Sequence, residues 1–239
     1  MELRNILEQL ARYDTASITN VVASYPGDKT GCLGLYNPWT VNWYTDQRIR
    51  CIFPELGPRV GYAVTVRYGM PDAHFNRLDF GDVLRAIDAS PKPVIVVMEQ
   101  ALPEHIKNKN GLSGGNMTTA MKRVGCVGVV SDGPSRDMNE IREMDFQYLL
   151  TGVCPGHGDF QIDAINAPVS VCGMDVAPGE IIHMDENGAC KFPADKAEQV
   201  LELVSRLCAE ESGHMKQMRE AAGVDDLVDL FLQKKKDKM

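Results

Sequence analysis

Residues 114–140 read GGNMTTAMKRVGCVGVVSDGPSRDMNE, and this stretch predicts how the chain is built. A glycine pair precedes a run with helical patterning, and Gly125 ends that run. Residues 126–131 are almost entirely apolar, as in a strand buried on both faces, and the Asp-Gly-Pro-Ser sequence after them is typical of a turn. A helix, a buried strand and a turn in succession indicate an α/β fold.

Two edges of this stretch are suited to one anionic ligand. A helix that begins near Gly115 presents unpaired backbone N–H groups and the positive end of its dipole, which favour a carboxylate. The turn after the strand delivers Arg136 and Asp137, a guanidinium beside a carboxylate. We therefore expect a ligand site here, and a structural ion pair between Arg136 and Asp137 is the alternative.

Length, charge and cysteine usage exclude several classes of protein. The 239 residues are enough for one large domain, or for a domain with an appendage. The net charge of -8 argues against a nucleic-acid partner, because phosphates attract basic surfaces. The seven cysteines are odd in number and include no Cys-x-x-Cys pair, which argues against a disulfide framework and a zinc site. Residues 1–13 read as an amphipathic helix rather than a signal or membrane segment, so we expect a cytoplasmic protein without a membrane partner.

Helical and strand periodicity alternate along the rest of the chain. Helices are expected at residues 1–13, 14–22 and 82–89, around Ile141 and Met144, and from 194 almost to the end. Strands are expected at residues 61–68, 93–98, 148–153, 168–172 and 179–184, with a tight turn at 185–188 that forms a hairpin with 189–192. This order indicates a layered α/β sandwich rather than a purely doubly wound sheet.

Three further features are less specific. Residues 35–55 carry Trp39, Trp43 and other aromatic residues without clear periodicity, which fits a lid, an interface or a binding loop as well as core aromatics. Cys154 and His157 share a Gly/Pro-rich loop, where a nucleophile pair is the sharper interpretation and a simple turn the favoured one. Four histidines have no metal-ligand spacing and are expected at the surface or at an interface: His74, His105, His183 and His214.

The spacing of Gly115, Arg136, Asp137 and Glu140 resembles the central signature of the RraA-like family, which contains 4-hydroxy-4-methyl-2-oxoglutarate aldolases and regulators of ribonuclease E activity. Twenty residues separate Gly115 from Arg136, Asp137 follows directly, and two residues intervene before Glu140. Shorter matches occur in family order at residues 14–16, 57–65, 81–84, 166–169, 178–180 and 185–188.

The resemblance covers roughly residues 10–205. It implies a compact, barrel-like RraA-like α/β domain over residues 1–205, with an N-terminal helical segment and an insertion at about 35–55. Residues 206–239 are left as a C-terminal helical extension. The family also implies a homotrimer or homohexamer with sites near subunit boundaries.

The resemblance further implies a divalent ion, Mg²⁺ or Mn²⁺. By position, Asp137 resembles the protein ligand of that ion, with water in most of the other ligand positions. Arg136 resembles the substrate-binding arginine. The loop whose backbone N–H groups hold the carboxylate of a pyruvate-like substrate is matched by Gly114, Gly115, Asn116 and Met117.

The reaction that the resemblance implies is cleavage of a carbon–carbon bond in a small 2-oxo acid, by retro-aldol reaction or decarboxylation. The ion and Arg136 would stabilise the pyruvate enolate. Aldolases of the family carry an acid at the position of Gly115, whereas glycine is a feature of the regulators, which lack this activity. Glu140 is the acid that remains in the signature, and further candidates are Asp132, Glu99 and Asp159. The sequence thus favours a metal-dependent lyase and leaves two alternatives: a non-catalytic regulator that acts through its oligomer surface, or another sugar-acid reaction in the same site.

Overall fold

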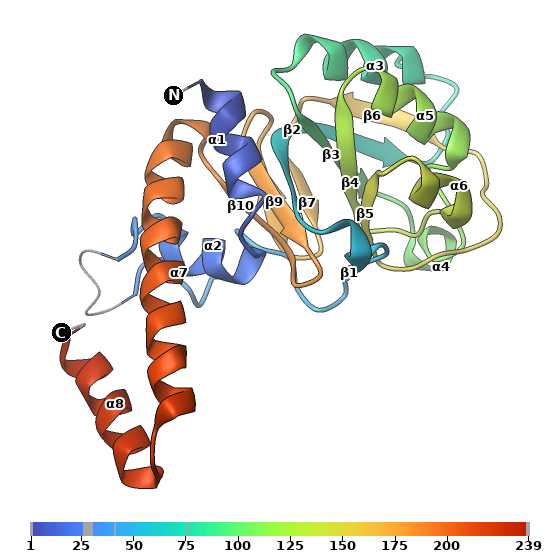
Figure 1. Ribbon diagram of the computed structural model, residues 1–239. Helices are drawn as coiled ribbons and strands as arrows, with labels where there is room; N and C mark the ends of the chain where they lie inside the picture. Colours follow the sequence, from blue (N-terminus) through green and yellow to red (C-terminus); the bar gives the residue numbers. More distant parts are fainter. Residues whose placement is uncertain (1, 26–30, 41, 76, 238–239) are drawn as a thin grey trace.

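The computed structural model describes residues 2–25, 31–40, 42–75 and 77–237, with side chains up to residue 232. Its main strands are β1 (Arg50–Cys51), β2 (Arg59–Gly69), β3 (Val94–Gln100), β4 (Cys126–Ser131), β5 (Gln147–Leu150), β6 (Gln161–Ile165), β9 (Ile181–Asp185) and β10 (Gly188–Phe192). They form a mixed sheet in the order β1-β5-β4-β3-β2-β9-β10, and β6 pairs with β2 off this path. The sheet curls toward a barrel and helices surround it, which confirms the expected α/β class (Figure 1).

Strands β2, β3, β4 and β5 run parallel to one another. The helices between them are α3 (Phe80–Ala89), α4 (Glu104–Lys107), α5 (Gly115–Arg123) and α6 (Met138–Glu143). Because each helix runs back to start the next parallel strand, the carboxyl ends of the strands and the N-termini of the helices meet at one edge of the sheet. That edge, called the carboxyl edge below, carries both ends of the stretch identified from the sequence.

Side chains alternate between the two faces along the central strands. In β3, Val94, Val96 and Met98 pack with residues of α3 and α5 in one hydrophobic core. Ile95 and Val97 lie in a second core on the opposite face. That face is covered by a small two-stranded sheet of β7 (Val169–Val171) and β8 (Met174–Val176). The apolar run of β3 is therefore explained by burial on both sides.

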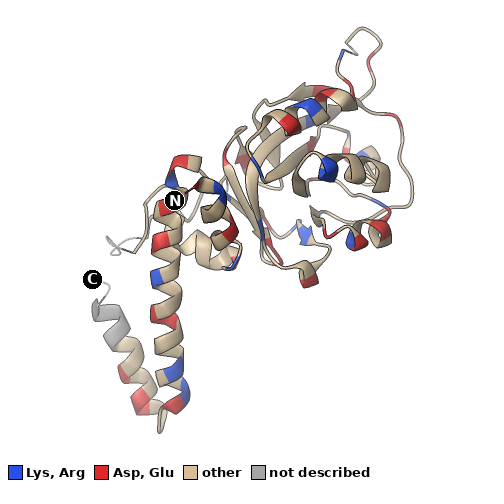
Figure 2. Cartoon of the chain, turned by 45° about the horizontal axis from the view of Figure 1, so that its top comes forward, with Lys and Arg blue, Asp and Glu red and all other residues tan. Residues whose placement is uncertain are grey.

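Two N-terminal helices, α1 (Leu3–Leu10) and α2 (Thr15–Val22), pack against α7 (Ala197–Glu220) and the β9–β10 hairpin. Helix α8 (Val224–Asp237) turns back along α7, and residues 206–237, called the arm below, project from the α/β body (Figure 1). Lys and Arg residues lie scattered among acidic residues over both body and arm (Figure 2). Within the described ranges, no helix has the length and apolar character that crossing a bilayer requires.

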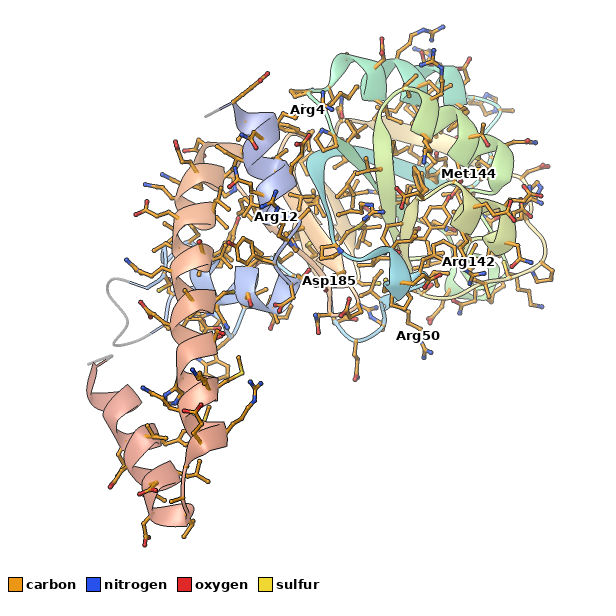
Figure 3. All side chains as sticks on the ribbon, viewed as in Figure 1. Arg4, Arg12, Arg50, Arg142, Met144 and Asp185 are labelled. Atoms are coloured by element: carbon orange, nitrogen blue, oxygen red, sulfur yellow. The ribbon has the colours of Figure 1, made fainter. Side chains whose placement is uncertain are left out.

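A buried polar network ties the turn between α1 and α2 to β9. The backbone N–H of Thr15 donates to Oδ2 of Asp185 at 2.7 Å, and the hydroxyl of Thr15 lies 2.9 Å from Nδ1 of His183. Figure 3 shows Asp185 between the sheet and these helices. His183 is fully buried, so its expected surface position was wrong. The reason is that β9 is covered on both faces, and all five of its residues are buried.

Most expected elements are present, and the differences have local causes. Strands β1, β6 and β8 were missed: β1 and β8 are only two and three residues long, and Asp163 interrupts the apolar pattern of β6. The strand expected over 148–153 ends at Leu150, since Val153 bridges Ser135 in the loop after β4 instead of continuing beside β4. Trp43 is a core residue stacked on Tyr36, whereas Trp39 is exposed. Helix α7 runs through residue 205, where the sequence suggested a boundary, without a break.

Candidate functional site

The N-termini of α5 and α6 meet at the carboxyl edge. Asp137 is the residue before α6 and has left-handed backbone angles, φ 62° and ψ 38°. Its carboxylate does not cap its own helix. Instead, Oδ2 of Asp137 accepts a hydrogen bond of 3.0 Å from the backbone N–H of Gly115, the first residue of α5. A non-glycine residue in this conformation is uncommon, Asp adopts it more readily than most residues, and such residues cluster at functional sites.

The glycine pair leaves room for two carboxylates. A Cβ atom at Gly114 would lie 2.2 Å from Oδ2 of Asp137 and 3.1 Å from Nε of Arg136. A Cβ atom at Gly115 would lie 2.1 Å from Oε2 of Glu140. Both distances to oxygen are shorter than any real contact, so side chains at these positions would displace the acids. The carboxylate of Glu140 therefore occupies the space that an acidic side chain at position 115 would need.

Arg136 borders the same space. Its side chain is 34% exposed, and its Nε atom lies 3.9 Å from Oδ2 of Asp137. This Nε atom is itself buried and has no hydrogen-bond partner in the described part of the chain. A Cβ atom at Gly111 would lie 3.4 Å from Cβ of Arg136 and 3.2 Å from Sγ of Cys154, so the loop that carries Cys154 closes one side of the site.

Three of the four residues expected to bind a substrate carboxylate keep open backbone N–H groups. Gly115 already donates to Asp137, as described above. The N–H groups of Gly114, Asn116 and Met117 have no acceptor among the described residues, and no side chain caps this end of α5. An anion at this helix end would thus be bound by Asn116 and Met117, together with Arg136.

Unpartnered polar atoms gather along the carboxyl edge. Over the described ranges, six buried side-chain atoms lack a hydrogen-bond partner. Five of them belong to residues at the ends of β2 and β3 or in the loops that follow β3 and β4: the Tyr68 hydroxyl, Nε2 and Oε1 of Gln100, Nδ2 of Asn110 and Nε of Arg136. Such atoms are rare in native proteins, and each is expected to bind water or a ligand.

A buried hydroxyl network fixes the start of α5. The hydroxyl of Tyr148 lies 2.9 Å from Oγ of Ser113 and 2.7 Å from Oγ1 of Thr118, and Oγ1 of Thr118 donates to the carbonyl of Gly114. Ser135, in the turn before Arg136, donates to the carbonyl of Ser113. Burial raises the pKa of Tyr148, so its hydroxyl stays protonated and can donate. Sequence reasoning missed these residues, because a tyrosine in a strand gives no sign of what its hydroxyl reaches.

The other acids considered from the sequence lie outside this cluster. Asp132 pairs with Nζ of Lys107 at 2.5 Å and accepts the N–H of Gln100. Glu99 accepts the N–H of Ser170 and lies 3.8 Å from Arg67. Asp159 is exposed in the loop before β6. Of the acids considered from the sequence, Glu140 is therefore the one whose carboxylate the structure places beside Gly115.

Cys154 and His157 do not form a nucleophile pair in the described chain. The thiol of Cys154 donates to the carbonyl of Gly156, and Nδ1 of His157 lies 3.2 Å from the carbonyl of Gly158. Each side chain thus contacts the backbone of its own loop. The arrangement agrees with a turn that contains both residues.

The carboxylate oxygens of Asp137 and Glu140 suit a divalent ion that keeps most of its water ligands. No group of three or more His, Cys, Asp or Glu side chains in the described part of the chain is arranged to hold a metal. Mg²⁺ is commonly bound through one or two carboxylates with water elsewhere, and Asp137 beside Glu140 offers that donor set. Zinc, which takes several nitrogen or sulfur ligands, does not fit.

A model of the RraA-like family, described as Aldolase/RraA, matches residues 39–190. The chain belongs to the RraA-like family. The matched region includes the whole of residues 114–140, so the converging carboxylates lie in the part of the chain that the RraA-like family shares.

Individual relatives agree with the RraA-like family. A protein of Burkholderia multivorans named as a putative 4-hydroxy-4-methyl-2-oxoglutarate aldolase is 28% identical over 144 residues, which cover 59% of this chain and 82% of that protein. An uncharacterized protein of Methanocaldococcus jannaschii is 26% identical over 171 residues, or 71% of this chain and 77% of that protein. The chain spans between 22% and 82% of the length of such relatives.

A solved structure shows the same fold. The Streptomyces coelicolor protein RraAS2, described as an unusual member of the RNase ES inhibitor RraA protein family, superposes with a TM-score of 0.62. The two sequences are 18% identical, and the match covers 90% of this chain and 96% of that one. At this identity the likeness concerns the fold alone.

Proposed function

We propose that the protein is a divalent-metal-dependent lyase that cleaves a carbon–carbon bond of a small 2-oxo acid, by retro-aldol reaction or decarboxylation. The observation that carries the proposal is the convergence of two carboxylates, Asp137 and Glu140, on the open N-terminus of α5 beside Arg136. Relatives named as aldolases of a hydroxy-2-oxo acid support the same reaction class.

Each residue has a role that follows from its position. A bound Mg²⁺ or Mn²⁺ supplies a Lewis acid that stabilises negative charge developing on a substrate oxygen. Asp137, fixed by the N–H of Gly115, holds the ion. The N–H groups of Asn116 and Met117, with the guanidinium of Arg136, bind the carboxylate of the 2-oxo acid.

Glu140 acts first as the general base and then as the general acid. Its carboxylate accepts the proton of the 4-hydroxyl group as the carbon–carbon bond breaks, and the electron pair of that bond remains with the enolate. The same proton then returns to the enolate carbon, which gives pyruvate. In a decarboxylation the bond breaks with loss of carbon dioxide, and the enolate carbon takes one proton that Glu140 has received from water.

A regulatory protein without lyase activity is the second candidate. The observation that favours it is the glycine at position 115 itself, since that position lacks its own acid. The two candidates differ in one respect that can be measured: a lyase releases pyruvate in the presence of the ion, and a binding protein does not.

The experiment follows pyruvate release from oxaloacetate and from 4-hydroxy-4-methyl-2-oxoglutarate, with Mg²⁺ or Mn²⁺ and with a chelator. We expect release that the chelator abolishes and that Asp137→Asn lowers by roughly two orders of magnitude, as for loss of a metal ligand. Glu143→Gln is the matched control, because Glu143 is an exposed acid on the same short helix. Release that is absent for both substrates, or equal in D137N and wild type, would contradict the proposal.

A further inference from the structure

A pocket of about 220 Å³ lies beside the candidate site at the carboxyl edge. Its apolar lining comes from the end of β2, the start of α3, the first turn of α5 and the region around the start of β6: Tyr68, Leu78, Phe80, Met117, Phe160 and Ile162. Met117 connects the pocket to the site, because it lines the pocket and its backbone N–H is one of the two open donors of α5. A ligand held by these donors can therefore extend into the pocket.

Two polar residues of the lining, Gln161 and Asp79, are already engaged by the protein. Gln161 accepts the N–H of Asp72 at 2.7 Å and donates to Asp163 at 2.8 Å. Asp79 accepts the N–H of Asp82 at 3.1 Å as part of the capping box of α3. The hydroxyl of Tyr68 is buried and has no partner among the described residues, so it is available to one water molecule or to an uncharged polar group of the ligand. No cation is found among the described residues that line the pocket, and Asp79 is the one charged group among them.

This lining discriminates between possible substrate tails. A second carboxylate would enter beside Asp79 without a counter-ion, which costs both desolvation and like-charge repulsion. A hydrocarbon tail would exchange water for the rings and aliphatic side chains of the pocket, which is favourable.

We propose that the pocket binds the far end of the substrate and that this end is an uncharged apolar group. The preferred substrate is then a 4-hydroxy-2-oxo acid with a single carboxylate and an aromatic or branched aliphatic tail, and dicarboxylates such as oxaloacetate are weaker substrates of the same site. The inference rests on the proposed function, because that function places the carboxylate and keto end of the substrate at Asn116, Met117 and Arg136.

The experiment measures binding to the full-length protein in Mg²⁺ by calorimetry. The probes are pyruvate, 2-oxoglutarate and 2-oxo-4-phenylbutanoate. We expect the phenyl compound to bind about tenfold more tightly than pyruvate, as for burial of a few methylene equivalents of apolar surface. 2-Oxoglutarate should bind no more tightly than pyruvate.

Three variants locate the effect. Leu78→Trp fills the pocket, so it should abolish the preference for the phenyl compound and leave the affinity for pyruvate unchanged. Leu232→Trp, an equal change at an exposed position of α8, should keep the preference. Asp79→Asn retains an N-cap residue and removes the charge, so it should improve the affinity for 2-oxoglutarate several-fold, as for removal of a nearby like charge.

The outcomes separate this inference from the proposed function. If pyruvate binds and the phenyl compound binds no better, or if L78W keeps the preference, the pocket inference is wrong and the lyase proposal stands. If only the phenyl compound binds, and L78W abolishes that binding, the pocket inference stands and the proposed placement of the 2-oxo acid is wrong. Tighter binding of 2-oxoglutarate than of the phenyl compound contradicts the pocket inference, and no binding of any probe contradicts both.

Discussion

The carboxylate of Glu140 depends on the absence of a side chain at position 115. A methyl group there would lie 2.1 Å from Oε2 of Glu140, yet this oxygen is the end of a flexible, exposed side chain that can rotate away. Gly115→Ala should therefore leave the free energy of unfolding within about 0.5 kcal/mol of wild type. Pyruvate release should fall by about two orders of magnitude, because the displaced acid no longer reaches the substrate proton.

The matched control for G115A is Gly213→Ala in α7. It adds the same methyl group at a glycine with no atom within 4 Å of the new Cβ, so activity should not change. Glu140→Gln should lose as much activity as G115A, since both remove the same proton acceptor. Wild-type release of pyruvate by G115A would show that Glu140 is not the proton acceptor, and steady-state rates with 4-hydroxy-4-methyl-2-oxoglutarate provide the measurement.

At the residue scale the sequence predicted which side chains meet, but not how they bond. The sequence placed Gly115, Arg136 and Asp137 together, because a helix start and a strand end meet at one edge of the sheet. Glu140 was one of four candidate acids, and its position beside Gly115 comes from the structure. The bond from the N–H of Gly115 to Asp137 depends on the left-handed backbone of Asp137, and no sequence pattern specifies that conformation. The unpartnered side chain of Gln100 was likewise invisible, since glutamine in a strand is usually expected to reach solvent.

At the element scale, the N-terminal helices are attached to the sheet through His183. Nε2 of this residue lies 3.2 Å from the carbonyl of Leu10, at the end of α1, and Nδ1 contacts Thr15, at the start of α2. Because the carbonyl of Leu10 can only accept a hydrogen bond, Nε2 of His183 carries the proton. Nδ1 of His183 then accepts a hydrogen bond from the hydroxyl of Thr15. The short helices α1 and α2 were predictable from their apolar spacing, whereas this attachment joins residues far apart in the sequence and was not.

Protonation of His183 should weaken this attachment. Burial lowers the pKa of His183, against the opposing effect of Asp185 and Asp14, so the folded chain favours the neutral ring. The unfolded chain takes up a proton near pH 6.5 that the folded chain does not. The contribution of neutral His183 to the free energy of unfolding is thus fully present above about pH 6.5. It decreases as the pH falls toward the lowered pKa of His183 in the folded chain.

Urea unfolding at pH 7.5 and at pH 5.5 measures this effect. Wild type should lose stability at the lower pH, and His183→Asn should show a smaller loss over the same interval. His105→Gln replaces an exposed histidine and should retain the wild-type dependence. Equal pH dependence in wild type and H183N would exclude His183 as the cause. Because H183N also breaks two contacts, the comparison uses the difference between the two pH values within each variant.

At the scale of the whole molecule, two surfaces of the single chain remain exposed to solvent. The site at the carboxyl edge remains open, with the side chains of Arg136 and Asp137 each about one third exposed. The arm presents large apolar side chains to solvent: Val224, Val228, Phe231 and Leu232. Contiguous exposed apolar surface on a soluble protein commonly marks a contact with another chain. The sequence predicted a helical extension here, and its periodicity could not say which face stays uncovered.

The exposed apolar side chains favour association with another chain, and the resemblance to the RraA-like family implies a homotrimer or homohexamer, which we expect for this protein. Light scattering coupled to size exclusion should give a mass of three or six times 26.4 kDa. The double variant Val228→Ser, Leu232→Ser removes apolar surface from exposed positions, so the fold should persist while the association weakens if the arm forms the contact. An unchanged assembly in this variant would place the contact on the α/β body, and a mass of 26.4 kDa for wild type at every concentration would contradict the expected association.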